Sequence, residues 1–156
     1  MPFRVYLSHS VAPHELGAIY GMAQLAEGRG LQAIVSDRRW QRVAPPPRIT
    51  QLLEGLDAFV IVATQFGEDM EWVKAELSTA LRLGLKPENV VSVVDEGIDL
   101  PWASGPVITI DRSDFRTTME QVVGTLERFE LDRNQRNLLG ALIVGGLVAL
   151  LLASKE

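Results

Sequence analysis

The 156-residue chain contains no cysteine, which excludes disulfide bonds, thiolate metal sites and a cysteine nucleophile. Only two histidines are present, so we expect no transition-metal site either. The formal net charge of −5 lacks the clustered excess of lysine and arginine that binding to nucleic acid requires. The length suits one domain with a sizeable core, so we expect a single domain that binds neither metal nor nucleic acid.

The N-terminus has no basic stretch followed by an apolar run, and it therefore does not resemble a secretory signal. One long apolar run occurs, because every residue from 138 to 153 is Leu, Ile, Val, Ala or Gly. At ~1.5 Å per residue this run reaches roughly 24 Å as a helix, slightly less than a hydrocarbon core of ~30 Å. We expect a single transmembrane helix over residues 138–154; the alternative is a helix buried in the protein core.

The charged residues that flank this segment predict its orientation in the membrane, and its small residues predict association with a second copy of the helix. Arg128, Arg133 and Arg136 precede it and Lys155 follows it, so the positive-inside rule places the folded domain in the cytoplasm. Small residues recur at every fourth position of the segment and permit close approach of two helices: Ala141, Gly145, Ala149 and Ala153. The sequence thus predicts a single-pass membrane protein that forms a homo-oligomer.

Five short apolar runs rich in β-branched residues predict buried strands. They cover residues 3–7, 31–35, 58–63, 90–94 and 107–110. Helical spacing predicts helices over residues 14–28, 48–55, 70–84 and 114–129, with an irregular loop over 95–105. This alternation predicts an α/β domain over residues 1–130, with a parallel sheet and helices on both faces. A polar linker over residues 131–137 would join the domain to the membrane helix.

Ligands of such a sheet bind beyond the carboxyl ends of its strands. The sequence Ser8-His9-Ser10 follows the first predicted strand, and Thr64 follows the third. The chain lacks the glycine-rich turn of dinucleotide-binding folds and the phosphate-binding loop of nucleotide hydrolases. It also lacks the acidic residues that a phospho-receiver domain carries after its first and third strands. Taken alone, His9 is an ordinary polar residue near a strand end.

Two motifs occur in succession in the middle of the chain. Residues 57–63 read D-A-F-V-I-V-A, and residues 72–81 read W-V-K-A-E-L-S-T-A-L. Earlier in the chain, residues 5–10 read V-Y-L-S-H-S, and Asp37 ends the second predicted strand. In their order and spacing these features resemble the Toll/interleukin-1 receptor (TIR) domain over about residues 3–129. With the apolar C-terminal segment, the chain is similar to bacterial TIR effectors that carry a membrane helix.

Two loops depart from the pattern of that family. A-P-P-P at residues 44–47 replaces the usual Pro-Gly after the second strand. G-E-D at residues 67–69 replaces the serine that usually stands just ahead of the helix tryptophan. Both departures affect the geometry of the loops and therefore the fit of a substrate.

The resemblance implies a flavodoxin-like, five-stranded sheet and cleavage of NAD at its nicotinamide glycosidic bond, in defence against phage or in stress signalling. Glu76 matches the catalytic glutamate of enzymatic TIR domains, and Trp72 shares its helix face. Ser8 and His9 would contact ribose or phosphate, and Trp40 would stack on a base or a neighbouring subunit. NAD is then a substrate, with no cofactor and no metal.

The residues also leave other functions open. A glutamate in the middle of a helix is usually solvated, which favours a non-enzymatic TIR adaptor that acts through protein–protein contacts. A nucleotide- or flavin-binding module on the same fold is a third alternative.

Overall fold

The computed structural model describes residues 2–36, 45–67 and 70–153, with only the backbone described for residues 141–153. The strands are β1 (Arg4–Ser10), β2 (Gln32–Val35), β3 (Ala58–Ala63), β4 (Val90–Val94) and β5 (Val107–Thr109). The helices are η1 (Pro13–Glu15), α1 (Leu16–Gly28), α2 (Pro47–Leu53), α3 (Glu71–Arg82), η2 (Pro87–Asn89) and α4 (Phe115–Ala153). The α/β class is therefore confirmed, and residues 95–105 form the expected loop.

The five strands form one sheet in the order β2-β1-β3-β4-β5, and every neighbouring pair is parallel. This is the strand order of flavodoxin-like sheets. The chain moves outward from β1 to β2, then crosses back to β3 and continues in the opposite direction. The order therefore reverses between β1 and β3, and the carboxyl ends of these two strands mark the place where such sheets bind ligands.

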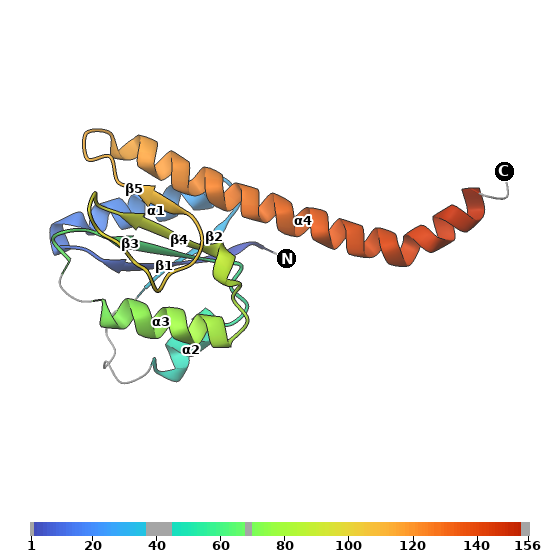
Figure 1. Cartoon of the computed structure of the whole chain (residues 1–156), viewed down its shortest axis with the longest axis horizontal. Helices are drawn as coiled ribbons and strands as arrows, with labels where there is room; N and C mark the ends of the chain where they lie inside the picture. The colour runs from blue at the N-terminus through green and yellow to red at the C-terminus, as the bar shows by residue number, and fades with distance from the viewer. Residues whose placement is uncertain (1, 37–44, 68–69, 154–156) are drawn as a thin grey trace.

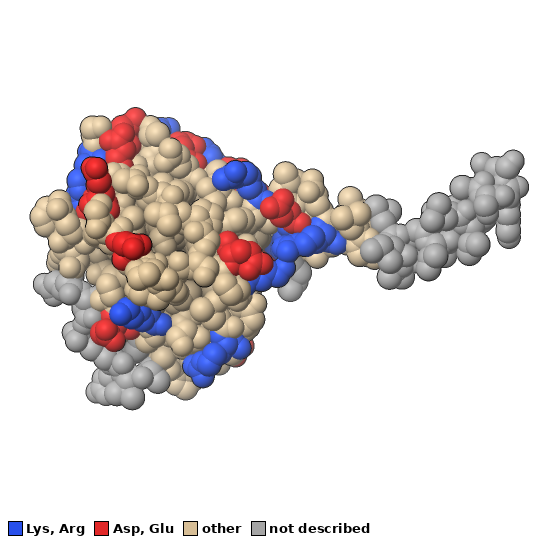
Figure 2. Space-filling model, viewed as in Figure 1, with Lys and Arg blue, Asp and Glu red and all other residues tan. Residues whose placement is uncertain are grey.

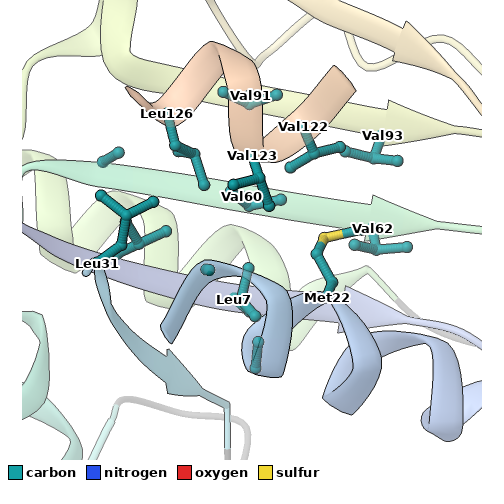
Figure 3. Close-up of a cluster of buried hydrophobic side chains, with 14 of the residues drawn as sticks. Leu7, Met22, Leu31, Val60, Val62, Val91, Val93, Val122, Val123 and Leu126 are labelled. Atoms are coloured by element: carbon teal, nitrogen blue, oxygen red, sulfur yellow. The ribbon is translucent and has the colours of Figure 1, made fainter. Parts of the chain in front are cut away.

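Helices cover both faces of the sheet (Figure 1). Because side chains alternate along a strand, Val5 and Leu7 of β1 pack under α1 and α4, whereas Tyr6 packs under α2 and α3. Figure 3 shows the first of these cores, where Met22 of α1 and Val123 of α4 meet Val60 and Val62 of β3. The two cores fix each helix against the sheet and thereby position the loops at both ends of the strands.

Strand β1 is longer than the apolar run predicts. It continues to Ser10, which pairs with Ala63 of β3, and the polar residues Ser8, His9 and Ser10 are buried inside the sheet. The prediction ended the strand at residue 7 because polar residues are rare in buried strands. Here the Ser8 hydroxyl has a partner inside the protein, which removes most of the cost of burial.

Helix α4 is one continuous helix of 39 residues, and at ~1.5 Å per residue it is roughly 58 Å long. The predicted linker over residues 131–137 continues this helix, because the segment contains no glycine or proline to end it. The last turns project far from the domain (Figure 1). Within the part of the chain that the structure describes, we find no helix both long and apolar enough to cross a membrane.

Candidate functional site

The carboxylate of Glu76 lies under the carboxyl ends of β1 and β2, enclosed by hydroxyl groups. Val73, Leu77 and Ala80 form the buried stripe of α3, and Glu76 is on the same stripe with no exposed surface. Ser8 donates a hydrogen bond of 2.8 Å to its Oε1. The hydroxyl of Ser36 lies 2.9 Å from Oε1 and 2.8 Å from Oε2 and shares its one hydrogen between them.

The third donor is the hydroxyl of Tyr6, which bonds Oε2 of Glu76. Tyr6 and Ser8 are two residues apart on β1, so both side chains point to the α3 face of the sheet. The Tyr6 ring also stacks on Phe59, with ring centroids 5.5 Å apart, and this contact holds the hydroxyl in place. We call Tyr6, Ser8, Ser36 and Glu76 the hydroxyl cage.

The hydroxyl cage suits an ionised carboxylate. Such a group only accepts hydrogen bonds, and Ser and Tyr hydroxyls can supply the donors it needs. A charged group without partners would cost several kcal/mol at this depth, and each bond to a charge returns about 1.5–3 kcal/mol. Three donors around one buried carboxylate therefore hold it in a fixed orientation, in surroundings of low dielectric where its field acts strongly.

The other predicted site residues are His9, Trp72 and Trp40, and the structure describes the surroundings of the first two. His9 is almost buried in β1, and its Nε2 is 3.4 Å from the carbonyl oxygen of Ser36. Trp72 lies one helical turn before Glu76 and is partly buried, packed against the core under α2 and α3. Trp40 lies outside the described residues, as does Asp37. The structure thus brings Ser8 and Glu76 into contact and places His9 beside their partner Ser36.

Sequence reasoning missed Tyr6 and Ser36. The alternation of β1 could have identified Tyr6, because it precedes Ser8 by two residues and must share its face. Ser36 directly follows β2, and its amide continues the ladder by donating to the carbonyl of Leu7 at 2.8 Å. Only the order of the strands, which places β2 beside β1, shows that Ser36 reaches Glu76.

A second polar cluster also lies at the carboxyl ends of the strands, around Arg112. Its guanidinium donates to Asp95 through Nε (2.8 Å) and Nη2 (2.6 Å), and Nη2 also bonds Glu15 at 3.1 Å. Thr64 donates to Glu15 at 2.7 Å, and the backbone N–H of Gln65 donates to Asp95 at 2.8 Å. These bonds join the loops that follow β1, β3, β4 and β5.

The ion pairs of this Arg112 cluster shift the pKa of its carboxyl groups. The hydrogen bond from Arg112 lowers the pKa of Asp95 below its ordinary value, although burial acts in the opposite direction. Burial would raise the pKa of Glu15, but hydrogen bonds from Thr64, Ala12 and Arg112 together outweigh it and lower that pKa. Both carboxylates are therefore ionised at neutral pH.

Among the described residues, no three histidine or acidic side chains come together in a way that would hold a metal ion. No protein-family model matches the chain, and no curated protein matches it either. The case for a function therefore depends on the chemistry of the two polar clusters and on the motifs of the sequence.

Proposed function

We propose that the chain is a membrane-anchored NAD hydrolase of TIR type, which cleaves the nicotinamide glycosidic bond with the help of Glu76. The observation that carries this proposal is the hydroxyl cage, which holds one buried carboxylate at the carboxyl ends of β1 and β2. The motifs at residues 57–63 and 72–81 support it, and so does the flavodoxin-like strand order.

A single carboxylate is sufficient for this reaction. Nicotinamide is bound to ribose through a cationic nitrogen and leaves as a neutral molecule, so no acid is needed to protonate it. The bond between C1′ and the ring nitrogen breaks with its electron pair on nicotinamide, and a water oxygen bonds C1′ and releases a proton. Positive charge develops on the ribose during this step, and the Glu76 carboxylate stabilises it.

Substrate contact requires the hydroxyl cage to open, because Glu76 has no exposed surface. The two serine hydroxyls occupy the acceptor positions that a ribose diol would use. In this proposal the ribose replaces Ser8 and Ser36 as the donor to Glu76, while Tyr6 keeps the carboxylate in its orientation. The exchange preserves the number of hydrogen bonds on the buried charge, so it avoids the cost of leaving that charge unpaired.

The proposal also includes a membrane anchor over residues 138–154. The apolar composition of this segment supports it, as do the three arginines before it and its position at the far end of α4. The domain then lies in the cytoplasm, where NAD is available. Oligomers held by the membrane helix would bring several domains together at the membrane surface.

The direct test compares nicotinamide release from NAD by two charge-removing variants on the same helix. Glu76→Gln keeps the size of the side chain and removes its charge, so we expect a loss of about 100- to 1000-fold in turnover. Glu71→Gln removes an exposed carboxylate from the first turn of α3 and serves as the control, with turnover near that of wild type. Near-normal turnover of Glu76→Gln, with matched circular dichroism, would rule out Glu76 as the catalytic carboxylate.

One observation favours a second function. Glu76 is wholly buried and bonded by three hydroxyls, which is also what a purely structural carboxylate needs. In that case the domain is a TIR adaptor that recruits partners through its surface. An active wild-type preparation excludes the adaptor function as the sole one, whereas a preparation that releases no nicotinamide even when clustered on liposomes favours it.

A further inference from the structure

A cavity of about 270 Å³ lies at the carboxyl ends of the strands, on the face of the sheet that α1 and α4 cover. Its apolar wall includes Ile19, Val62 and Ile110, which belong to the core that Figure 3 shows in part. Glu76 and Tyr6 lie on the opposite face of the sheet, in the layer of α2 and α3. We call this space the switch-point cavity, because it lies between the loops that follow β1 and β3 and is separate from the hydroxyl cage.

Both the place and the lining of the switch-point cavity are typical of small-molecule sites. Open parallel sheets bind ligands where the strand order reverses, and here that is between β1 and β3. Such sites are mainly apolar, with a few polar groups that orient the ligand. In this cavity Phe115 completes the apolar wall, and His14, Glu15, Thr64 and Arg112 are the polar lining residues. Hydrogen bonds join Glu15, Thr64 and Arg112 into one rim.

The rim presents a hydrogen-bond acceptor next to a donor. Oε1 of Glu15 accepts bonds from Thr64 and from the backbone N–H of Ala12, whereas its Oε2 accepts from Arg112 and retains a lone pair. The contacts found among the described residues use Nε and Nη2 of Arg112, which leaves the two hydrogens of Nη1 for a ligand. The Arg112 side chain is 43% exposed and therefore accessible. A ligand that presents a hydrogen-bond donor beside an acceptor would complement Oε2 of Glu15 and Nη1 of Arg112.

Charge and size restrict the ligand further. Arg112 is already paired with Glu15 on the rim and with Asp95 behind it, so these three side chains together carry a net charge of −1 and leave no uncompensated positive charge for an anion. The apolar wall disfavours a strongly hydrated cation. With a volume of about 270 Å³, the cavity lies just below the range of about 300–1,000 Å³ that holds drug-sized ligands, so it suits a small ligand such as a two-ring heterocycle.

We propose that the switch-point cavity binds an uncharged, planar nitrogen heterocycle that presents a hydrogen-bond donor and acceptor side by side, as a nucleobase does. Its donor bonds Glu15, its acceptor receives a hydrogen bond from Arg112, and its ring lies against Ile110 and Phe115. This inference does not depend on the proposed NAD cleavage, because it uses other residues on the other face of the sheet.

The test titrates adenine into the full-length protein in detergent micelles, with isotope labels on the isoleucine methyl groups. Ile19 and Ile110 line the cavity, whereas Ile49 and Ile61 belong to the core on the other face and serve as internal controls. We expect saturable shifts of the first pair only, with a dissociation constant of about 1 mM or lower. 9-Methylpurine has no N–H donor at all, neither the amino group nor the ring N–H of adenine, and should bind about tenfold more weakly or worse.

Two neighbouring positions on α1 supply matched variants. Ala18→Leu adds volume inside the cavity and should weaken adenine binding at least about tenfold. Gly17→Leu adds the same kind of side chain where nothing lies within 4 Å, so it should bind as wild type does. If Ala18→Leu does not fold, the comparison of adenine with 9-methylpurine on the wild type decides.

The proposal is overturned if neither Ile19 nor Ile110 shifts in a saturable way, or if 9-methylpurine binds as well as adenine. A folded Ala18→Leu that binds adenine like wild type also overturns it. Because Glu76→Gln leaves the cavity intact, that variant should still bind adenine. Failure of the cavity proposal is therefore distinguishable from failure of the NAD hydrolase proposal.

Discussion

Ser8 and Ser36 each have one hydroxyl hydrogen to donate to Glu76, which Ser8 directs to Oε1 and Ser36 shares between both oxygens. We therefore expect Ser36→Ala and Ser8→Ala each to lower the free energy of unfolding by about 1–3 kcal/mol. Ser78→Ala on the exposed face of the same helix as Glu76 should change it by less than about 0.5 kcal/mol. Urea unfolding measures all three, and a cost for either buried serine as small as that of Ser78→Ala would contradict the geometry of the cage.

The ion pair between Asp95 and Arg112 should make the stability of the fold depend on pH. The pKa of Asp95 is lowered from its ordinary value of 3.8 in the folded chain, so the unfolded chain takes up a proton first as the pH falls. The stability that Asp95 contributes is therefore complete above about pH 4 and is lost as the pH falls through its folded pKa. Asp95→Asn should flatten the dependence of the melting temperature on pH in this acid range. A variant as acid-sensitive as wild type would contradict this prediction.

The sequence allowed part of the candidate site to be predicted at the level of single residues. Glu76 and Ser8 were expected in one cleft and are hydrogen-bonded, but the expected cleft residues lie inside the protein and not on its surface. Polar residues at the end of a predicted strand suggest a solvent-facing loop unless their hydrogen-bond partner is known. That partner comes from a helix 68 residues away in the chain, so no local pattern of residues could have indicated the burial.

The turn between β3 and α3 packs directly on the end of β1, and Gly67 makes this possible. A Cβ atom at residue 67 would lie 2.0 Å from the carbonyl oxygen of Ser10, a distance that forces the backbone to move. We expect Gly67→Ala to destabilise the fold by about 1–3 kcal/mol. Gly17→Ala, in open space on α1, should instead be neutral or stabilise by up to about 1 kcal/mol. Thermal melts of the two variants with equal midpoints would contradict this account of the turn.

Among the elements, the strands were the easiest to predict and the end of α4 was the hardest. Buried parallel strands appear as unbroken runs of β-branched residues, and β3 and β4 match their predicted bounds. Residues 131–137 are polar and have no apolar stripe, so their periodicity gave no sign of a helix. They are helical because no residue in them breaks the helix that begins at Phe115.

The continuity of α4 can be tested with spin labels, because the chain has no cysteine of its own. Labels at Ser78→Cys and Gly140→Cys should give a narrow distance distribution in the full-length protein. Adding Asn134→Pro removes a backbone hydrogen bond and kinks or breaks the helix, at a cost of about 3 kcal/mol, so the distribution should broaden. A distribution equally broad without the proline would contradict a continuous helix.

Helix α4 also determines which way the domain faces. It starts beside the carboxyl end of β5 and runs back past the opposite edge, where Arg133 bonds Asp57 at 3.2 Å and lies 5.2 Å over the ring of Phe3. Acidic and basic side chains gather around the point where α4 leaves the domain (Figure 2). If residues 138–154 span a bilayer, the hydroxyl cage and the switch-point cavity therefore face away from the membrane.

A truncation after Asn137 tests the anchor in the whole molecule. The core residues that α4 supplies end at Leu126, with Phe129 packed against them, so this truncation keeps the packing of the domain and the Arg133 contact. We expect the full-length protein in the membrane fraction after an alkaline wash and the truncated protein in the supernatant. Both proteins in the supernatant would contradict the anchor.

The most direct test is nicotinamide release by the full-length protein on liposomes, with NAD supplied in the surrounding buffer. Wild type and Glu76→Gln are reconstituted at matched surface densities, and the released nicotinamide is quantified over time. The account predicts release by wild type, with a rate per molecule that rises as the density of the protein on the membrane rises. It also predicts release at least about 100-fold slower for Glu76→Gln at every density. Equal rates for the two proteins, or no release by wild type at the highest density, would contradict the assignment of a membrane-anchored NAD hydrolase.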